Sequence, residues 1–357
     1  MTKSAHIFLG ANSAQGFSSL YDQLLSGRFD DLLILKGGPG CGKSSFMRRV
    51  AEELSTAGQT PVYVHCSGDP DSLDGVLFPA LRTALVDGTS PHALEPTYAV
   101  VCERYVDLTR FYDVEAAKQK RTELMALTDA YRAHYRDAYH ILRAADEVGA
   151  ERRASLHAHM DFAKLDRRMR SIAARELRGK HTESGGVDYA FLGGMTHKGD
   201  ICRFDTVEAL CPRVYALCDS AGLGNGALQM LCAMAVEGGE RVLACCDPDR
   251  PAELQHLLLP GRGVAFVTSN ERISYEGETH RRIRLDAMAE ASISRAEKAK
   301  LRFLRRVERE LRAEAVAKLA DAKRAHDALE SVYNPMVDFD GAYELAHTEA
   351  QRLIDRA

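Results

Sequence analysis

The chain has 357 residues, of which 45% are hydrophobic and 27% are charged, and its formal net charge is −4. This length exceeds what one hydrophobic core usually organises, so two globular domains are expected. The slight negative charge argues against a general nucleic-acid coat and against a protein that binds anionic membranes. No apolar run approaches the ~20 residues of a membrane span, so a membrane protein is not expected either.

The nine cysteines have no metal-type C-x-x-C spacing, and only Cys245 and Cys246 are adjacent. An odd number of scattered cysteines is typical of reduced thiols in the cytosol. The first residues show no apolar segment of signal-peptide length. Together these features predict a cytoplasmic protein.

The N-terminal part of the chain predicts alternating strands and helices. Strands are expected at about 6–10, 31–36, 61–66 and 83–86. Helices are expected at about 17–26 and 44–57, with a short one at about 73–77. An alternation of this length favours an α/β fold, with a parallel sheet and helices on both of its faces.

A glycine-rich stretch, Gly37–Ser44, separates the apolar run Leu32–Leu35 from the helix that follows. It matches the pattern G-x-x-x-x-G-K-[ST] in the strand-turn-helix setting that the pattern requires. Glycines let successive N–H groups point at phosphate oxygens, and the helix N-terminus favours anions. Lys43 would reach the β- and γ-phosphates, and the Ser44 hydroxyl would bind Mg²⁺. The predicted nucleotide-binding residues are Gly38, Pro39, Gly40, Cys41, Gly42, Lys43, Ser44 and Ser45.

Acidic residues follow two of the predicted strands. Asp87 ends the strand Ala84–Val86 and is predicted to hold magnesium, alongside Ser44. The next residue is Gly88, so the water-activating glutamate of many ATPases is missing there. Asp69 and Asp71 follow the strand at 61–66, where phosphates lie in doubly wound folds, and either could act as the base. His92 and Glu95 are third choices, and no histidine spacing predicts a structural metal.

From about Thr97 the sequence becomes charged and helical. Apolar residues at spacings of three and four predict a packed helix pair, with a turn at Val148-Gly149. Packing is the simplest interpretation of this pair, and an arm that binds a partner protein is the alternative. Gly179–Gly186 is the expected joint between two halves.

The second half repeats the first. Phe8-Leu9-Gly10 recurs as Phe191-Leu192-Gly193, and Asp69-Pro70-Asp71 recurs as Asp247-Pro248-Asp249, in the same order along the chain. Such collinear matches indicate a duplication. The second half is expected to end in helices at about 287–332 and 341–356, around a break at Asn334-Pro335.

The second copy of the glycine-rich stretch, at 219–226, is degenerate. Asn225 stands for Lys43 and Gly226 for Ser44, and Asp219 replaces Gly37. Without a lysine or a magnesium-binding hydroxyl, and with Asp219 at its mouth, this loop is expected to repel a triphosphate. Arg262 or Arg272 of this half could act as an arginine finger toward the first half.

The loop Gly37–Ser44, with Asp87 beyond it, resembles the P-loop NTPase superfamily. The stretches His65–Gly75 and Val86–His92 resemble an uncharacterised family of bacterial tandem P-loop ATPases, over essentially the whole chain. The resemblance implies ATP binding and hydrolysis, with the loop residues and Asp87 as the site. The repeat and the order of elements predict two tandem P-loop NTPase-like parallel-sheet domains, the second degenerate, each followed by a helical hairpin. The expected domains are 1–180, with a helical extension at about 97–180, and 187–357, with one at about 287–357.

The sequence thus predicts a protein that binds ATP and Mg²⁺ at one N-terminal site and hydrolyses the nucleotide. Lys43, Asp87, Asp69 and Asp71 are its candidate catalytic residues. Two alternatives stay open: a small-molecule kinase with Asp69 or Asp71 as base, and a non-catalytic switch in which ATP orders the helical arms. Preference for ATP over GTP is not decided by any motif.

Overall fold

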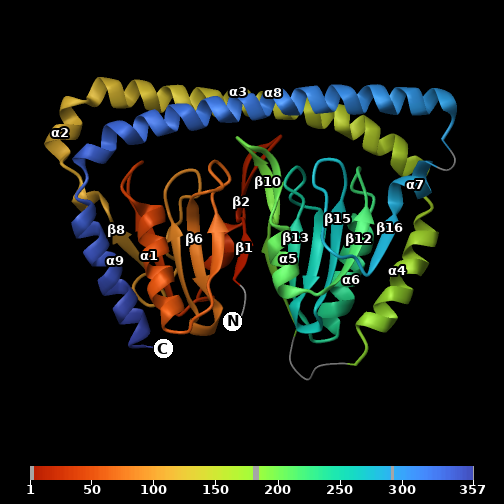
Figure 1. Ribbon diagram of the computed structural model, residues 1–357, viewed down its shortest axis with the longest axis horizontal. Coiled ribbons are helices and arrows are strands. Elements are labelled where there is room, and N and C mark those ends of the chain that lie inside the picture. Colours follow the sequence, from red (N-terminus) through yellow and green to blue (C-terminus); the bar gives the residue numbers. More distant parts are fainter. Residues whose placement is uncertain (1–3, 180–184, 291–292, 357) are drawn as a thin grey trace.

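The computed structural model describes residues 4–179, 185–290 and 293–356. Two six-stranded sheets stand side by side beneath two long antiparallel helices (Figure 1). No helix within the described residues is long and apolar enough to cross a membrane. All nine cysteines are free, and five of them are buried, as expected for reduced thiols that pack as small apolar side chains.

The first sheet has the strand order β1-β5-β6-β7-β4-β8. Strand β6 runs antiparallel to both of its neighbours, whereas the other adjacent strands are parallel. A two-stranded hairpin, β2 (Gly10–Ser13) and β3 (Gly16–Ser19), follows β1. The sheet strands are β1 (Ala5–Ile7), β5 (Val62–His65), β6 (Leu73–Phe78), β7 (Thr83–Asp87), β4 (Asp31–Lys36) and β8 (Glu103–Asp107).

The sheet is therefore mixed and not wholly parallel, and the helix predicted at 73–77 is wrong because those residues form β6. All six residues of β6 are buried between β5 and β7. Gly75 allows this close packing, since a Cβ there would lie 3.2 Å from the Leu85 carbonyl oxygen. A short segment of this kind is ambiguous between strand and helix, and here its central place in the sheet decides.

The expectation of helices on both faces is also wrong for the first sheet. Helices α1 (Lys43–Thr56) and α9 (Phe339–Ile354) pack together on one face. The predicted helix at 17–26 is instead β3 and a single 3-10 turn, Tyr21–Leu24. That turn and neighbouring loops cover the other face through buried side chains, namely Tyr21, Leu24, Phe29 and Leu94.

The second sheet has the order β9-β13-β14-β15-β12-β16, which matches the first sheet strand for strand, hairpin included. The predicted duplication is thus confirmed at the level of the fold. Helix α5 (Phe204–Leu210) precedes β12, and α6 (Asn225–Glu237) follows it. The strands are β9 (Gly186–Ala190), β13 (Arg241–Cys246), β14 (Leu254–Leu259), β15 (Val264–Ser269), β12 (Arg213–Cys218) and β16 (Arg281–Arg284), with the hairpin β10 (Gly193–Thr196) and β11 (Gly199–Cys202).

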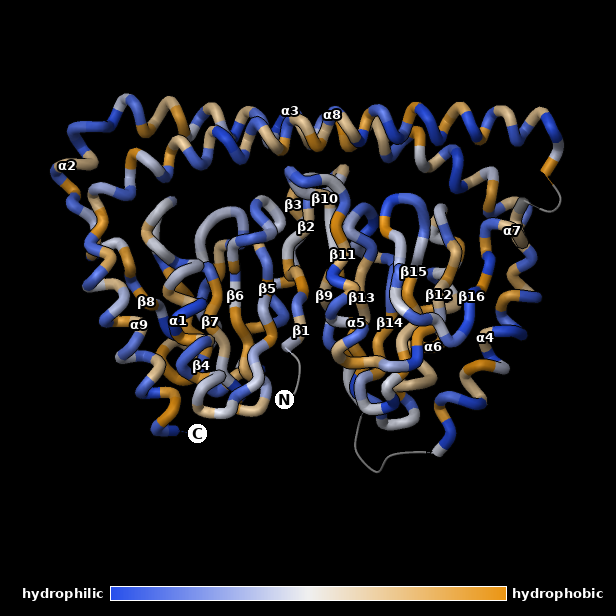
Figure 2. Tube along the Cα trace, viewed as in Figure 1, coloured by the Kyte–Doolittle hydropathy of each residue, from blue (hydrophilic) through white to orange (hydrophobic). Residues whose placement is uncertain are grey.

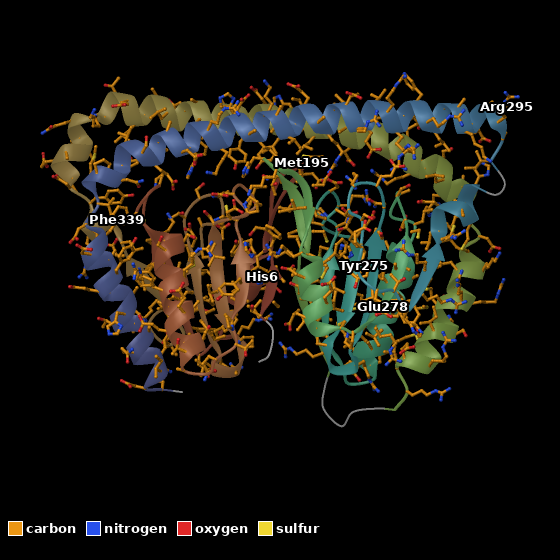
Figure 3. All side chains as sticks on the ribbon, in the orientation of Figure 1. His6, Met195, Tyr275, Glu278, Arg295 and Phe339 are labelled. Carbon is orange, nitrogen blue, oxygen red and sulfur yellow. The ribbon has the colours of Figure 1, made fainter. Side chains whose placement is uncertain are left out.

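The two halves meet through equivalent residues. The backbone N–H of Phe8 donates to the carbonyl of Phe191, and the N–H of Phe191 donates to that of Phe8, both at 2.8 Å. His6 N–H donates to the hydroxyl of Thr206, and the Asn12 amide donates to the Met195 carbonyl. Figure 3 labels His6 and Met195 between the two sheets. A reciprocal bond between repeat-related residues indicates an approximate two-fold relation between the halves.

The predicted turn at Val148-Gly149 is wrong, because a single helix, α3 (Arg121–Ala158), runs through it. It follows the short helix α2 (Val114–Gln119) and lies antiparallel to α8 (Arg295–Tyr333). Gly149 serves close approach: a Cβ there would lie 3.1 Å from a Glu308 carboxylate oxygen on α8. Apolar and polar residues alternate along both long helices in Figure 2. Their central seam is Ala138, Leu142, Ala315 and Leu319, so α3 does pack as predicted, but on α8 of the second half and not on a return helix of its own half.

The helices after each sheet pack on the other half instead of folding back as a hairpin (Figure 1). Helix α4 (Phe162–Glu176) follows α3 and packs on α6 of the second half, while α9 packs on α1 of the first. The short helix α7 (Leu285–Glu290) precedes α8. Most of the predicted joint Gly179–Gly186 lies outside the described residues.

Candidate functional site

The loop Gly37–Gly42 joins the buried strand β4 to helix α1, at the carboxyl edge of the first sheet. Gly40 and Gly42 have φ angles of +74° and +82°, a left-handed conformation that strains other residues. Cys41 is buried beneath the loop, its sulfur filling the space where a Cβ at Gly37 would lie. Ser45 is half-buried in the first turn of α1. The loop therefore curls as its sequence predicts.

The Lys43 ammonium lies inside this curl. Its Nζ donates to the carbonyls of Gly37 and Gly38, at 2.9 and 3.0 Å, and lies 3.6 Å from Asp87 Oδ2. Burial opposes the charge of Lys43, but the carboxylates of Asp87 and Asp74 outweigh burial and raise its pKa. The side chain therefore stays positively charged at neutral pH.

Asp87 ends β7, which lies directly beside β4 in parallel. Its Oδ1 accepts hydrogen bonds from the backbone N–H and the hydroxyl of Thr89, at 2.8 and 2.6 Å, and these fix the carboxylate. The Ser44 hydroxyl accepts from the Leu73 N–H at 3.0 Å, so it lies at the start of β6. A carboxylate and a hydroxyl are oxygen ligands of the kind that Mg²⁺ prefers.

Gly88 explains why no glutamate follows Asp87. A Cβ at this position would lie 2.2 Å from Ile34 Cγ2, and the Gly88 carbonyl accepts from Lys36 Nζ at 2.7 Å. The backbone of this turn thus packs directly on β4. A larger residue cannot be placed there without moving the strand.

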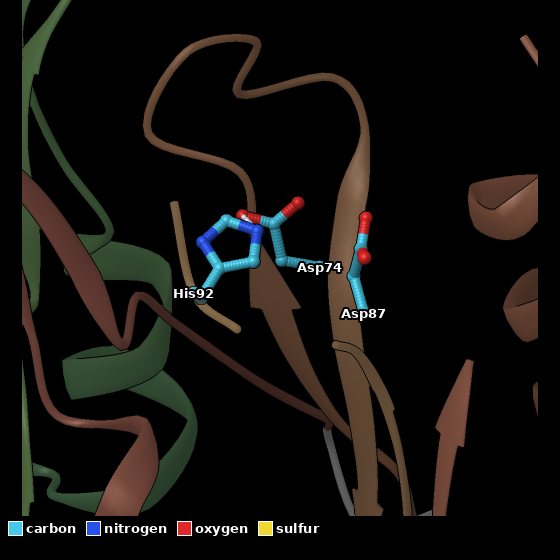
Figure 4. Close-up of side chains that lie close together, drawn as sticks. All are labelled: Asp74, Asp87 and His92. Carbon is cyan, nitrogen blue, oxygen red and sulfur yellow. Dashed lines mark ion pairs between the residues drawn. The ribbon is translucent and has the colours of Figure 1, made fainter. Parts of the chain in front are cut away.

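A buried acid that the sequence analysis did not propose lies next to Asp87. Asp74, on β6, forms a cluster with Asp87 and His92 in which the ligand atoms lie within 4.8 Å of one another (Figure 4). Tyr21 donates its hydroxyl proton to Asp74 Oδ2 at 3.3 Å, and His92 Nε2 lies 3.6 Å from the same oxygen. Burial raises the pKa of Asp74, and the Asp87 charge adds to this, while His92 opposes it.

The signal that could have found Asp74 is a charged residue inside a run that is otherwise apolar or glycine. In the helix predicted at 73–77, Asp74 would point away from the sheet edge, so that prediction gave no reason to place Asp74 beside Asp87. His92, a third choice, does join the cluster. Glu95 does not: its side chain is 80% exposed and pairs with Lys36 and the hydroxyl of Tyr105.

Asp69 and Asp71 lie in the loop after β5, where cations of the second half hold both. Lys323 on α8 lies 3.4 Å from Asp69 Oδ2, which also accepts from the Ser72 hydroxyl. Lys198 pairs with Asp71, and this hydrogen bond lowers the pKa of the Asp71 carboxyl. An acid held at lowered pKa is a weaker base.

The second loop is closed by its own carboxylate, so the expectation that Asp219 stands at the mouth is wrong. Asp219 is only 2% exposed, and its two oxygens accept from the backbone N–H groups of three loop residues. These donors are Ala221, Leu223 and Gly224, at 3.1, 3.0 and 2.8 Å. The Asn225 Oδ1 accepts a hydrogen bond from the Leu254 N–H at 2.9 Å, just as the Ser44 hydroxyl accepts one from the Leu73 N–H.

The strand register shows that both buried acids are also lost in the second half. Gly75 pairs with Val86 in the first sheet, and His256 pairs with Val267 in the second. The residue before Gly75 therefore corresponds to Gln255, and the residue after Val86 corresponds to Thr268. Both replacements are neutral, so the lysine and its two nearby acids are missing together.

Arg262 and Arg272, the two candidate arginine fingers, pair with acids of the second half. Arg272 pairs with Asp249, and Arg262 pairs with Glu240 and donates to the Arg178 carbonyl. A pocket at the edge of the second sheet is lined by Arg272 and other arginines. Those arginines are matched by carboxylates, and the pocket does not reach Lys43.

One family model, described as nephrocystin 3, N-terminal, matches residues 17–172. The matched segment contains the glycine-rich loop, the rest of the first sheet after β1, and helix α3. No curated protein and no solved structure matches the chain.

Proposed function

We propose that the first half is a P-loop NTPase domain that binds one Mg·ATP and hydrolyses it, and that the second half is a degenerate tandem copy without a nucleotide. One observation carries this proposal: the charged Lys43 lies inside a left-handed glycine loop, 3.6 Å from Asp87. Loop amides and the helix N-terminus would bind the phosphates, and Lys43 would turn from the loop carbonyls to the β- and γ-phosphates.

The residues at this edge fit a magnesium ion. Ser44 and Asp87 would hold it, and a bound ion would neutralise charge on the transferring phosphoryl group. Lys43 and the loop amides stabilise the same charge from the other side. Because the Lys43 ammonium lies 3.6 Å from a carboxylate that could hold a metal, the site is suited to a polyphosphate with its metal and not to a bare anion.

Asp74 supports hydrolysis by a route that does not need a glutamate after Asp87. It lies on the neighbouring strand, and Tyr21 and His92 orient its carboxylate. In this proposal it positions the attacking water, whereas Asp69 and Asp71 are occupied by Lys323 and Lys198. These ion pairs make the small-molecule kinase the less supported alternative.

Calorimetry and phosphate release test the proposal directly. We expect one ATP per chain in the presence of magnesium, and steady phosphate release without any added substrate. Release only after adding a metabolite pool would favour the kinase, and tight binding without release would favour the switch. Two nucleotides per chain, or none, would contradict a single live site.

Asp74→Asn is expected to lower the rate of phosphate release about 100-fold while leaving ATP affinity within about threefold. The amide keeps the size of the carboxylate but loses its charge. The matched control is Asp71→Asn, which removes an exposed acid of the same site region and should leave turnover unchanged. Equal turnover in wild type and Asp74→Asn would assign water positioning to another group.

A further inference from the structure

The glycine-rich loop carries one contact that a bound phosphate would have to break. The Gly40 N–H donates to Glu330 Oε1, 3.2 Å away on helix α8 of the second half. Asn334, one turn further, lies against the same spot: its amide nitrogen, turned toward the loop, is 3.1 Å from the carbonyls of Gly40 and Glu330. A loop amide of this kind is a donor that phosphate oxygens use.

The second half shows a carboxylate that accepts from neighbouring donors of the equivalent loop. There, Asp219 satisfies the N–H groups of Ala221, Leu223 and Gly224, which flank the position that corresponds to Gly40. In both halves, therefore, an acidic side chain takes hydrogen bonds from the glycine-rich loop. In the second half that acid is part of the loop and almost fully buried.

Glu330 differs because it comes from a distant part of the chain and can leave. Its side chain is 38% exposed, and on the same helix its Oε2 lies 3.9 Å from His326 Nδ1, with the Asp327 carboxylate within 4.8 Å. Glu330 can exchange its bond from Gly40 for bonds from water, whereas Asp219 is held in place by three N–H groups of its own loop. In the first loop, therefore, another hydrogen-bond acceptor can replace Glu330 at the Gly40 N–H.

Helix α8 links this acid to the second half. Arg312, 18 residues before Glu330 and so about 27 Å along the helix, pairs with Asp249 and Asp200 of the second half. Lys323 pairs with Asp69, in the loop beside the candidate site. The C-terminal part of α8 is therefore held by the second half at Arg312 and by the first glycine-rich loop at Glu330.

We infer that Glu330 competes with the nucleotide phosphates for the glycine-rich loop, so that nucleotide binding releases the C-terminal end of α8. This inference rests on the proposed function of the first half. Because coupling is reciprocal, anything that pulls α8 away from the loop raises nucleotide affinity by the factor with which the nucleotide favours the released helix. Nucleotide binding at the glycine-rich loop and the position of α8 are then coupled.

The test compares wild type with Glu330→Ala, using Mg·ATP in calorimetry and hydrogen exchange of the amides at 325–336. Loss of the competing acid is expected to tighten ATP binding about tenfold. In wild type, ATP should speed exchange at 325–336, and in Glu330→Ala exchange should already be fast and should not respond. The control Asp327→Ala removes the same charge one turn away and should bind as wild type does.

The outcomes separate this inference from the function on which it rests. If neither wild type nor Glu330→Ala binds ATP, the proposed function fails. If both bind ATP equally well, or the variant binds more weakly, the function stands and the competition by Glu330 is refuted. Tighter binding in Asp327→Ala as well would reduce the effect to general electrostatics and would also refute it.

Discussion

Lys43→Ala is expected to lower ATP affinity at least about 100-fold and phosphate release about 10³-fold, the largest functional effect of any single substitution here. The ammonium is the one positive side chain in the loop, and its pKa is raised, so it is charged whenever a nucleotide arrives. Alanine removes that charge but leaves both left-handed glycines and the helix N-terminus in place.

The fold should survive this change, since the loop carbonyls that Lys43 contacts can turn to water and Asp87 keeps its two bonds from Thr89. Thermal unfolding within a few degrees of wild type would confirm that. The matched control is Asn225→Ala, at the equivalent position of the second half, which should leave binding and turnover unaltered. Unchanged binding in Lys43→Ala would refute the proposed site, and lost binding in Asn225→Ala would move the nucleotide to the other half.

Arg312→Ala is expected to destabilise the second half by about 3–5 kcal/mol. Arg312 is 9% exposed and donates to Asp200 and to both oxygens of Asp249. Burial by itself raises the pKa of the Asp249 carboxyl, but Arg312 and Arg272 outweigh burial and hold it well below its usual range. Removing Arg312 leaves that buried carboxylate only partly compensated.

Urea denaturation followed by circular dichroism measures this loss, with the midpoint of the earliest transition as the readout because two joined halves need not unfold together. The control is Arg309→Ala, one turn earlier on the same helix, where the side chain is 72% exposed and its pair is weak. It should stay within about 0.5 kcal/mol of wild type. Equal stability of the two variants would show that the Arg312 network is not what holds α8 to the second half.

The features that the sequence predicted correctly are those written in local patterns. Glycines followed by lysine and serine indicate a strand-turn-helix from local sequence alone. The duplication could be predicted from the order of short matches along the chain. The features it missed depend on neighbours distant in the chain. The role of Asp74 depends on the position of β6 between β5 and β7. The role of Gly149 depends on Glu308, which packs against it from α8.

The same reason explains the error over Asp219. A lone acidic residue in a loop predicts a charge at its mouth, but the three loop N–H groups that Asp219 satisfies are produced by the fold of the loop itself. Likewise, a break after a long helix predicts a hairpin when only local spacing is considered. Which sheet the next helix covers is decided by apolar side chains on the other half.

The crossed placement of α4 and α9 has a consequence for the order in which the molecule can be completed. The ribosome makes the first sheet well before α9, yet Ala346, Ala350 and Leu353 of α9 fill the core around α1. Until those residues emerge, the earliest-made sheet keeps part of its apolar face open to water and to chaperones. The first half is therefore completed only after the second, because α4, which covers the second sheet, is made before that sheet, whereas α9, which covers the first, is made after both.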